Sequence, residues 1–417
     1  MLFRFEIWAK VIKFMRILVV HNLHRTGSAS GDDQVFRSEV RLLRSLGHEV
    51  AEYTVSNDRF DGQELIGKAF MSAGMFWSFE HYYGIIRAIK KTRPHVMHVH
   101  TFFPLLSPSI LYAAHRCGVP VVATLHDTRF ICPCATSLRN GESCNRCGDG
   151  RYLRMVRYGC FKNSKLQSLV VALIFSWHRI RKSFYRMIDE YICLNDIQIK
   201  LLEKIGFEKK KIIKKYNFVT DQDAGIIASQ PEGVPERFVV YYGRIGEEKG
   251  IRVLMRAWEY LPDVPLVVMG GGPLEEEFRK WAEGRRNIFY LGYTDHAKCL
   301  SYAKNAAFVV MPSIWYEGCP MTAIEAESLG IPIVASNIGF FREALKDGEN
   351  GLKFPLGNAE IMAACVRKLF EDPEECARMG AAARADYEAK YTPEGSAGQL
   401  IGIYRKAIHR IRLKNEG

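Results

Sequence analysis

Apolar residues occur in short continuous runs along most of the chain, and a helical pattern separates each run from the next. Residues 32–47, for example, repeat apolar positions with the period of a helix, and Gly47 ends that helix. Runs that are apolar throughout and alternate with helices predict a parallel sheet covered on both faces. The strands predicted in the first half of the chain are 16–22, 48–55, 96–100, 120–126 and 190–195.

The same alternation returns in the second half of the chain. Residues 221–236 lie between the two sets of strands and are rich in Asp, Gly and Pro, which predicts a linker. The expected fold class is therefore α/β, with two Rossmann-like doubly wound parallel-sheet domains facing a cleft. The strands predicted in the second half are 237–244, 265–271, 288–293, 307–313 and 332–337.

The length of 417 residues also favours two domains over one. We expect an N-terminal extension (1–14), an N-terminal domain (15–220), the linker (221–236), a C-terminal domain (237–394) and a C-terminal helix (395–417). We expect this last helix to pack back on the N-terminal domain.

The formal net charge of +12 indicates an anionic partner. Residues 151–186 hold nine Lys and Arg and no Asp or Glu, interleaved with apolar residues. This stretch predicts a basic amphipathic helix that lies on anionic lipid, and a solvated helix face is an equally good interpretation. Zinc-finger, RNA-recognition and homeodomain patterns are missing, so we do not expect nucleic acid as a partner. No apolar run reaches the length of a membrane span, and residues 1–14 lack the pattern of a secretory signal.

The stretch after the strand 307–313 carries two carboxylates, Glu317 and Glu325, on either side of Gly318-Cys319-Pro320-Met321. Pro320 suits the first turn of a helix, and Gly318 allows a ligand to approach the backbone closely. The free N–H groups of a helix start can bind a diphosphate. A carboxylate accepts two hydroxyls at once, as a sugar or ribose diol requires.

In this context, EGCPMTAIEAESLGIPIVASN and the following GFFREALKDGENGLKF, the chain resembles the retaining glycosyltransferases of family 4, which have the GT-B fold. The resemblance covers residues 15 to about 400. It implies that Glu325 binds the nucleotide ribose and Glu317 the donor sugar. Two surface glutamates flanking a packed helix are the alternative, but the strand–loop–helix context favours the functional interpretation.

Two cations follow another strand of the second half. Arg244 ends the strand 237–244, and Lys249 comes five residues later at the start of a helix. Such cations can neutralise the charge that develops on a departing diphosphate. The spacing resembles that of the family, whose members use an Arg and a Lys for this purpose.

The N-terminal half offers fewer candidates. Gly31 resembles the second glycine of the turn that faces the donor phosphates in the family, and Ser30 replaces the first. Asp32 or Asp33 is expected to cap the following helix. By the same resemblance, His126 lies beside the reacting end of the donor sugar. His100 and Thr101 end the preceding strand and could line the acceptor side.

Five of the eleven cysteines fall between positions 132 and 160. Cys132, Cys144, Cys147 and Cys160 could form a structural zinc site, with Cys134 as an extra candidate. Free thiols or a redox-dependent pair are the alternatives. A zinc ion here would be structural, and we expect no cofactor to be required for catalysis.

These observations predict a retaining, metal-independent glycosyltransferase that uses a nucleoside-diphosphate sugar. The expected acceptor is a glycan or lipid-linked glycan of cell-surface polysaccharide biosynthesis. The enzyme would be cytoplasmic and peripheral at the inner face of the cell membrane. A sugar-nucleotide epimerase or phosphorylase on the same fold, or a non-catalytic binding protein, are the alternatives. The sequence does not specify the base, sugar, linkage or acceptor.

Overall fold

A computed structural model describes residues 14–26, 30–60, 74–139, 142–221 and 233–416. All but one residue of the predicted extension 1–14, and residues 222–232 of the predicted linker, lie outside this part of the chain. The chain forms two compact units. The first unit draws on Met1–Ala135, Arg146–Lys215 and Ser396–Gly417, and the second on Thr136–Asn145 and Tyr216–Gly395.

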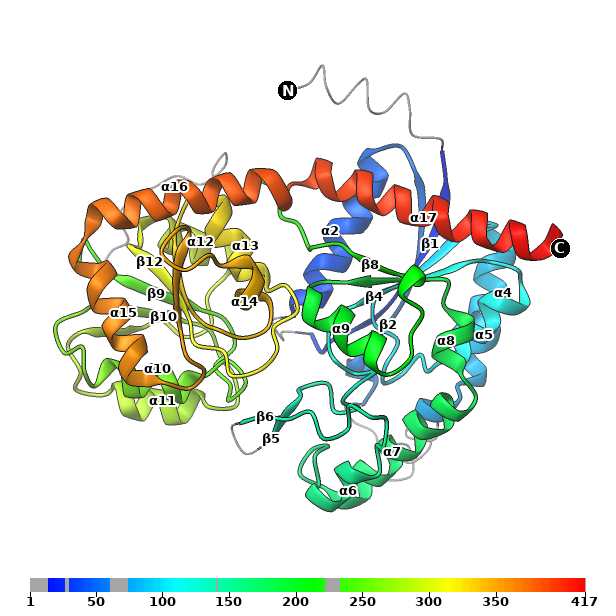
Figure 1. The fold of residues 1–417 in the computed structure, drawn as a ribbon, viewed down its shortest axis with the longest axis horizontal. Helices are drawn as coiled ribbons and strands as arrows, with labels where there is room; N and C mark the ends of the chain where they lie inside the picture. The colour runs from blue at the N-terminus through cyan, green and yellow to red at the C-terminus, as the bar shows by residue number, and fades with distance from the viewer. Residues whose placement is uncertain (1–13, 27–29, 61–73, 140–141, 222–232, 417) are drawn as a thin grey trace. The chain divides into compact units, whose positions relative to one another are not determined.

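A parallel sheet forms the centre of the first unit (Figure 1). It has six strands in the order β2-β1-β3-β4-β7-β8, and every neighbouring pair is parallel. The strand order reverses between β1 and β3, which makes this pair the switch point of the sheet. The strands are β1 (Arg16–Leu23), β2 (Glu49–Ser56), β3 (Val96–Val99), β4 (Val121–Leu125), β7 (Glu190–Cys193) and β8 (Ile212–Lys214).

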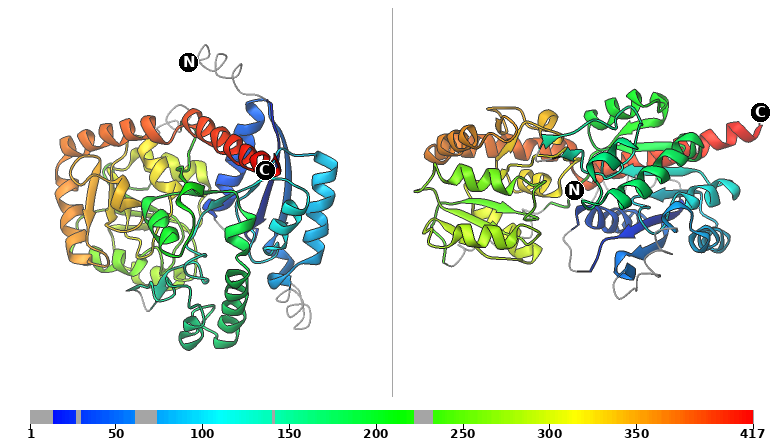
Figure 2. Two further views of the ribbon diagram at one scale, coloured as in Figure 1. Left: turned by 45° about the vertical axis from the view of Figure 1, so that its right-hand side comes forward. Right: turned by 90° about the horizontal axis from the view of Figure 1, so that it is seen from below.

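Helices cover both faces of this sheet. Side chains of α4, α5 and α7 pack on one face with Leu18, Val20 and Val99. Side chains of α2 and α17 pack on the other with Ile17, Val19 and Val96. Helices α4 and α5 lie side by side in all views (Figures 1 and 2). The helices are α2 (Gly31–Ser45), α4 (Phe79–Thr92), α5 (Ser109–Arg116), α6 (Arg154–Tyr158), α7 (Lys165–Ile180), α8 (Ser183–Met187), α9 (Asp196–Lys204) and α17 (Pro393–Glu416), with short 3-10 turns at Asn57–Phe60 and Lys209–Lys211.

The second unit repeats the plan with a six-stranded parallel sheet in the order β11-β10-β9-β12-β13-β14. Here the order reverses between β9 and β12. The strands are β9 (Val239–Tyr242), β10 (Leu266–Met269), β11 (Ile288–Tyr290), β12 (Phe308–Met311), β13 (Ile333–Ser336) and β14 (Gly351–Phe354). The hairpin of β5 (Leu138–Arg139) and β6 (Glu142–Ser143) belongs to this unit, because Leu138 packs against its core.

Alternate side chains of these strands are buried on opposite faces. Val239 and Tyr241 pack with α10 and α15, while Val240 is buried on the other face, where α12, α13 and α14 contact the sheet. The helices are α10 (Ile251–Trp258), α11 (Glu275–Ala282), α12 (His296–Asn305), α13 (Met321–Ser328), α14 (Phe340–Ala344), α15 (Ala359–Glu371) and α16 (Pro373–Lys390).

The prediction of two doubly wound parallel sheets is confirmed. All ten predicted strands are present, each with bounds shifted by a few residues. Two edge strands, β8 and β14, were not predicted. Both are short, and β8 lies between lysines, so neither has the long apolar run that identifies a buried strand.

Candidate functional site

The loops that follow β9 and β12 meet at the switch point of the second unit. The two strands are parallel neighbours, with Val240 opposite Val309, so both loops leave from the same edge of the sheet. The backbone N–H of Ile314 donates to the carbonyl oxygen of Glu248 at 3.0 Å. This edge is where doubly wound sheets bind their ligands.

Glycine permits the close contact of these loops at Gly250. Its φ of +71° lies in the left-handed region, and a Cβ atom there would collide with the carbonyl of Pro312. Gly339 is a second such position, since a Cβ atom would lie 2.6 Å from the backbone nitrogen of Glu317. The backbone around the candidate residues is therefore closely packed.

Lys249 and Glu317 form an ion pair in this closely packed region. The Lys249 Nζ lies 2.7 Å from Glu317 Oε1, and the Ser313 hydroxyl donates to the same oxygen at 2.6 Å. Glu317 is 3% exposed. The Lys249 ammonium also lies 5.3 Å from the ring centroid of Trp315, within cation–π range. Lys249 is thus held in place by residues of the loop that follows the neighbouring strand.

Glu325 lies on α13, one turn into the helix, and is buried. Its Oε1 lies 2.8 Å from His296 Nε2, at the start of α12. Hydrogen bonding to this carboxylate raises the pKa of His296 above its usual value. Burial, followed by the nearby Glu325 charge, raises the pKa of Tyr242 well above its usual value. No pattern in the sequence indicated a role for His296.

The start of α13 lies between the two acids. Pro320 occupies the N-cap position, and its side chain makes no capping hydrogen bond to the first turn of the helix. Cys319 is buried, and its carbonyl oxygen accepts a hydrogen bond from Asn217 Nδ2 at 2.8 Å. With Gly318 and Met321, these residues form the loop that the sequence assigned to the donor.

Arg244 is the most accessible of the four charged candidates in the second unit. Its side chain is 56% exposed, and its Nε lies 3.5 Å from Glu248 Oε1. A cation at this position can reorient toward a ligand at little cost, because an exposed ion pair is weak. Arg244, Lys249, Glu317 and Glu325 thus all lie in the second unit, on the loops and the helix that follow β9 and β12.

In the first unit, Gly31 is the first residue of α2. Ser30 caps this helix by accepting from the backbone N–H of Asp33, so the expectation of an Asp32 or Asp33 cap is wrong. Asp33 instead binds two imidazoles, His21 Nε2 at 2.8 Å and His24 Nδ1 at 3.1 Å. Burial opposes ionisation of Asp33, but these hydrogen bonds lower its pKa overall.

His126 follows β4 directly, and its side chain is 3% exposed. Its Nδ1 lies 3.7 Å from Asp32 Oδ1, and its Nε2 lies 3.0 Å from His100 Nδ1. Burial lowers the pKa of His126, although the nearby Asp32 charge opposes the shift. His100 is itself buried, whereas Thr101 is partly exposed and accepts a backbone hydrogen bond from Asn22.

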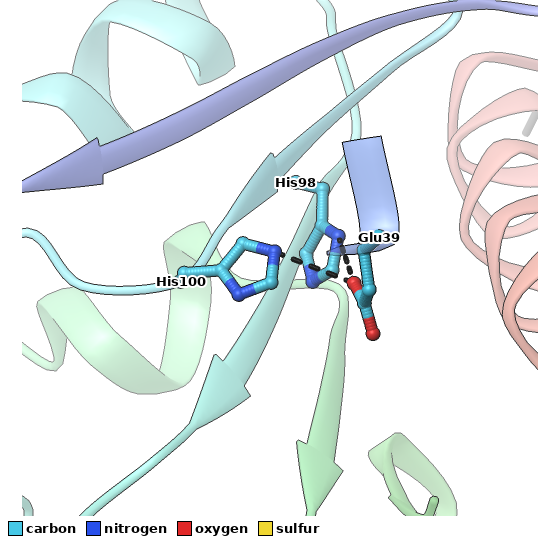
Figure 3. Close-up of side chains that lie close together, drawn as sticks. All are labelled: Glu39, His98 and His100. Atoms are coloured by element: carbon cyan, nitrogen blue, oxygen red, sulfur yellow. Dashed lines mark ion pairs between the residues drawn. The ribbon is translucent and has the colours of Figure 1, made fainter. Parts of the chain in front are cut away.

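His100 belongs to a group of polar side chains whose other members were not predicted from the sequence. Glu39, His98 and His100 converge from α2 and from β3 and the loop that follows it (Figure 3). Lys215 and Tyr404 contact Glu39 and His98, respectively. One signal was available: Glu39 lies within the apolar stripe of α2, between Phe36 and Val40.

The cysteines of the cluster fall in both units. Cys134, Cys147 and Cys160 pack against one core of the first unit, and the Sγ atoms of Cys132 and Cys134 lie 3.1 Å apart. Cys144 follows the β5–β6 hairpin and groups with the second unit. These positions do not test zinc binding, so the zinc site stays a prediction.

The basic stretch 151–186 forms α6, α7 and α8. Four large apolar side chains of α7 are exposed, Leu166, Leu173, Trp177 and Ile180. Their spacing of seven, four and three residues places them on one side of the helix. No helix in the described part of the chain is both long and apolar enough to span a bilayer.

Two family models match the chain, one in each half. The model described as Glycosyltransferase Family 4 matches residues 30–222, and the model described as Glycosyl transferases group 1 matches residues 225–386. Together they span both units and all four candidate residues of the second unit.

Curated proteins of known activity are similar over much of the chain. A glycogen synthase of Mycobacterium tuberculosis is 26% identical over 412 residues, which cover 93% of this chain and 90% of that protein. A phosphatidyl-myo-inositol mannosyltransferase of Mycolicibacterium smegmatis is 28% identical over 253 residues, covering 58% of this chain and 63% of that protein.

Solved structures share the fold. A sucrose-phosphate synthase of Thermosynechococcus elongatus superposes with a TM-score of 0.69 at 18% identity, covering 95% of this chain and 100% of that one. The Anabaena protein HepE, solved with UDP and glucose, has a TM-score of 0.62 at 16% identity, covering 93% of this chain and 98% of its own. The predicted GT-B fold is therefore confirmed.

Proposed function

Because the chain belongs to glycosyltransferase family 4, we propose that it transfers a sugar from a nucleoside-diphosphate sugar to an acceptor hydroxyl with retention of configuration. The observation that carries this proposal is the Lys249–Glu317 ion pair at the switch point of the second unit. A cation and an acid held there, with Glu325 on the adjoining helix, suit a ligand that has both phosphates and hydroxyls.

The donor would bind along the start of α13. Glu325 would accept the two ribose hydroxyls, and Glu317 would accept hydroxyls of the sugar. Between them, the loop of Gly318, Cys319 and Pro320 and the N–H of Met321 would face the diphosphate, where the helix dipole favours negative charge. The UDP bound to the similar protein HepE supports a nucleotide donor of this type.

The reaction would begin with cleavage of the bond between the anomeric carbon and the diphosphate oxygen. Arg244 and Lys249 would stabilise the charge on the departing diphosphate, so the proposal needs no metal ion at the reacting centre. The sugar passes through an oxocarbenium-like state. The acceptor oxygen attacks from the side of the leaving group and gives its proton to a diphosphate oxygen. His126 would lie beside the reacting carbon.

We also propose that the acceptor is a lipid-linked glycan used in cell-surface polysaccharide biosynthesis, and that α7 holds the enzyme on the membrane. The exposed apolar side of α7 is flanked by Lys165, Arg181 and Lys182. Apolar residues bordered by cations are the pattern that binds anionic bilayers. The location would be cytoplasmic, at the inner face of the membrane. The mannosyltransferase relative, whose name specifies a phosphatidyl-inositol, is consistent with a lipid acceptor.

A structural zinc ion at Cys132, Cys144, Cys147 and Cys160 is a further proposal. Cys147 and Cys160 both pack against one core of the first unit, and Cys134 beside Cys132 is an alternative ligand. Metal analysis of the purified protein should give about one zinc per chain, because four thiolates bind zinc tightly. A metal-free protein with unchanged melting temperature would exclude the site.

Product analysis tests the proposed function. The protein would be incubated with a panel of nucleoside-diphosphate sugars, with and without membrane lipid extract as the source of acceptor. A transferase forms a new α- or β-glycoside of the donor's own configuration, together with nucleoside diphosphate, only when the acceptor is present. An epimerase changes the sugar without an acceptor, a phosphorylase requires inorganic phosphate, and a binding protein forms no product.

A further inference from the structure

The first unit contains a buried row of polar side chains that leads from its interior to His126. Glu39, His98, His100, Lys215 and Tyr404 are all nearly inaccessible to solvent. They lie among the apolar residues that α2, α17 and the sheet bury together. Buried charges are costly unless they are paired, so the arrangement calls for an explanation.

The ion pair of Lys215 and Glu39 anchors the row. Lys215 Nζ lies 2.8 Å from Glu39 Oε1. Burial alone would raise the pKa of Glu39, but the Lys215 charge and the two imidazoles hold it well below its usual value. Glu39 is therefore a carboxylate that can only accept hydrogen bonds.

Metal binding is the first function to consider, because Glu39, His98 and His100 bring three potential ligand atoms close together (Figure 3). Two of the three side chains are already engaged. Tyr404 Oη and Thr124 Oγ1 each lie 2.8 Å from a ring nitrogen of His98, and the Lys215 ammonium lies beside Glu39. A divalent cation would be repelled by this ammonium. The row suits proton placement better than metal binding.

Glu39 determines which ring nitrogen of the neighbouring His100 carries the proton. His100 Nε2 lies 3.3 Å from Glu39 Oε2 without the alignment of a full hydrogen bond, and neither atom has another hydrogen-bond partner among the described residues. Burial lowers the pKa of His100, so its ring is neutral and carries one proton. Because the carboxylate cannot donate, that proton lies on Nε2, and Nδ1 of His100 is left as an acceptor.

The same argument then determines which ring nitrogen of His126 carries its proton. Its Nε2 lies 3.0 Å from the acceptor Nδ1 of His100, so Nε2 of His126 must donate. A neutral His126 then has a lone pair on Nδ1. That nitrogen points toward the start of α2, where Asp32 Oδ1 lies 3.7 Å away. Nδ1 and the Asp32 carboxylate are then both acceptors, so Nδ1 is left to accept a hydrogen bond from a hydroxyl that donates to it.

We propose that Glu39 and His100 are positioning residues that fix the proton of His126 on Nε2, so that its Nδ1 accepts a hydrogen bond from a substrate hydroxyl. The hydroxyl could belong to the donor sugar or to the acceptor, and both share the chemistry of an alcohol beside the reacting carbon. The role in turnover rests on the proposed transferase function, whereas the proton position does not.

Nitrogen NMR of histidine-labelled protein tests the proton position without substrate. Protonated and unprotonated ring nitrogens resonate far apart, and His126→Gln identifies the signals of His126. The wild-type protein should show the proton of His126 on Nε2 at neutral pH. A proton on Nδ1 of His126 in the wild-type protein would overturn the proposal.

Glu39→Gln supplies the decisive variant. A carboxamide can donate to His100 Nε2, which reverses every hydrogen bond of the row and moves the proton of His126 to Nδ1. Because Glu39→Gln removes the carboxylate charge beside the buried Lys215 ammonium, the double variant Glu39→Gln/Lys215→Met, which removes both charges, repeats the test if the single variant does not fold. Tyr404→Phe is the matched control, since Tyr404 contacts His98 and not His100 or His126. It should leave the proton on Nε2.

Turnover provides the second readout. In the reversed row kcat should fall about tenfold, the scale of one lost hydrogen bond, with KM for the donor changed by much less. An unmoved proton and unchanged kcat in both Glu39 variants would contradict the positioning role. If Glu39→Gln moves the proton but the wild-type protein transfers no sugar from any donor, the proposed function would be contradicted, while the proposed control of the His126 proton by Glu39 would stand.

Discussion

Lys249 Nζ lies 2.7 Å from Glu317 Oε1, so a cation after one strand and an acid after the neighbouring strand neutralise each other at the switch point of the second unit. Lys249 is partly exposed, whereas Glu317 is almost fully buried. An incoming diphosphate can therefore draw the ammonium toward itself while Glu317 stays fixed by Ser313. The pair keeps the site neutral until a ligand binds.

Replacement of Lys249 by Ala should lower kcat by about a hundred- to a thousandfold, the loss typical of one preorganised charge-stabilising group. Nucleotide affinity should change less, because the helix start and Glu325 remain. Lys280→Ala on α11 is the matched control, since its side chain is 70% exposed and its ion pair among the described residues is with the neighbouring Glu276. Steady-state rates with the donor identified by product analysis would check this. A Lys249→Ala enzyme with wild-type kcat would remove Lys249 from the mechanism.

His296 should make nucleotide affinity depend on pH. Its pKa is raised by the hydrogen bond to Glu325, so the charged imidazole occupies that carboxylate near and below pH 6.5. A ribose must displace it, and the displacement becomes easier as pH rises through the raised pKa. Affinity for a nucleoside diphosphate should therefore increase about three- to tenfold between pH 6 and pH 8.5.

His296→Gln should remove most of this pH dependence, and His409→Gln on α17 should retain it. Isothermal calorimetry across the pH range measures both. The stability of the fold should depend on pH in the opposite direction to nucleotide affinity. The His296–Glu325 pair stabilises the fold below the unfolded pKa of about 6.5 and is lost as pH rises above the folded value. Equal affinities at both pH extremes in the wild-type protein would refute the competition.

Glu327 should make the second unit less stable as pH rises. Burial and the nearby Asp386 charge raise its pKa well above the usual value, so the folded protein keeps this acid protonated after the unfolded chain has ionised it. Above the ordinary value of 4.5, the free energy of unfolding should fall by about 1.4 kcal/mol per pH unit until the folded pKa is reached.

Glu327→Gln removes the ionisable group and keeps its shape. The variant should be more stable than the wild-type protein at neutral pH, and the difference should shrink toward pH 4.5. Denaturant unfolding at several pH values measures this. A destabilised Glu327→Gln protein at pH 7 would show that the carboxylate is needed in its charged form.

The exposed side of α7 should bind anionic vesicles. Leu166 and Ile180 are 72% and 76% exposed, and each buried aliphatic side chain contributes about 1.5–3 kcal/mol. The double variant Leu166→Ser/Ile180→Ser should therefore partition at least about tenfold more weakly. Leu413→Ser on α17 is the control, because Leu413 is also exposed but lies outside this helix.

Vesicle sedimentation with anionic and neutral lipid, at low and high salt, measures this binding. Salt should weaken it, since the flanking cations contribute. Equal binding of the wild-type protein and the Leu166→Ser/Ile180→Ser variant would argue for a solvated helix face.

Much of the fold follows from local sequence pattern, because buried parallel strands are short apolar runs and the helices between them have a clear period. The acids and cations of the second unit also followed from their places at strand ends. The partners of the two acids were not predicted from the sequence. Glu317 pairs with Lys249, whereas Glu325 pairs with His296, so the two acids contact different groups.

Local sequence pattern does not predict the row of buried polar side chains behind His126. Tyr404 and His98 are 306 residues apart in the chain, and Lys215 and Glu39 are 176 apart. Contacts at these separations depend on how α2 and α17 pack on one sheet, which no local pattern encodes. Only the charged Glu39 within an apolar helix stripe indicated that something polar lay opposite.

Binding of nucleoside diphosphates tests the central claim most directly, namely that the second unit binds an activated sugar beside Glu325. Calorimetry would titrate UDP, GDP and ADP into the wild-type protein, Glu325→Ala and Glu327→Gln, the last being a matched control two residues along α13. We predict that at least one nucleotide binds the wild-type and Glu327→Gln proteins equally well and binds Glu325→Ala about ten- to a hundredfold more weakly. Equal affinity in all three proteins, or no binding to any of them, would contradict the account.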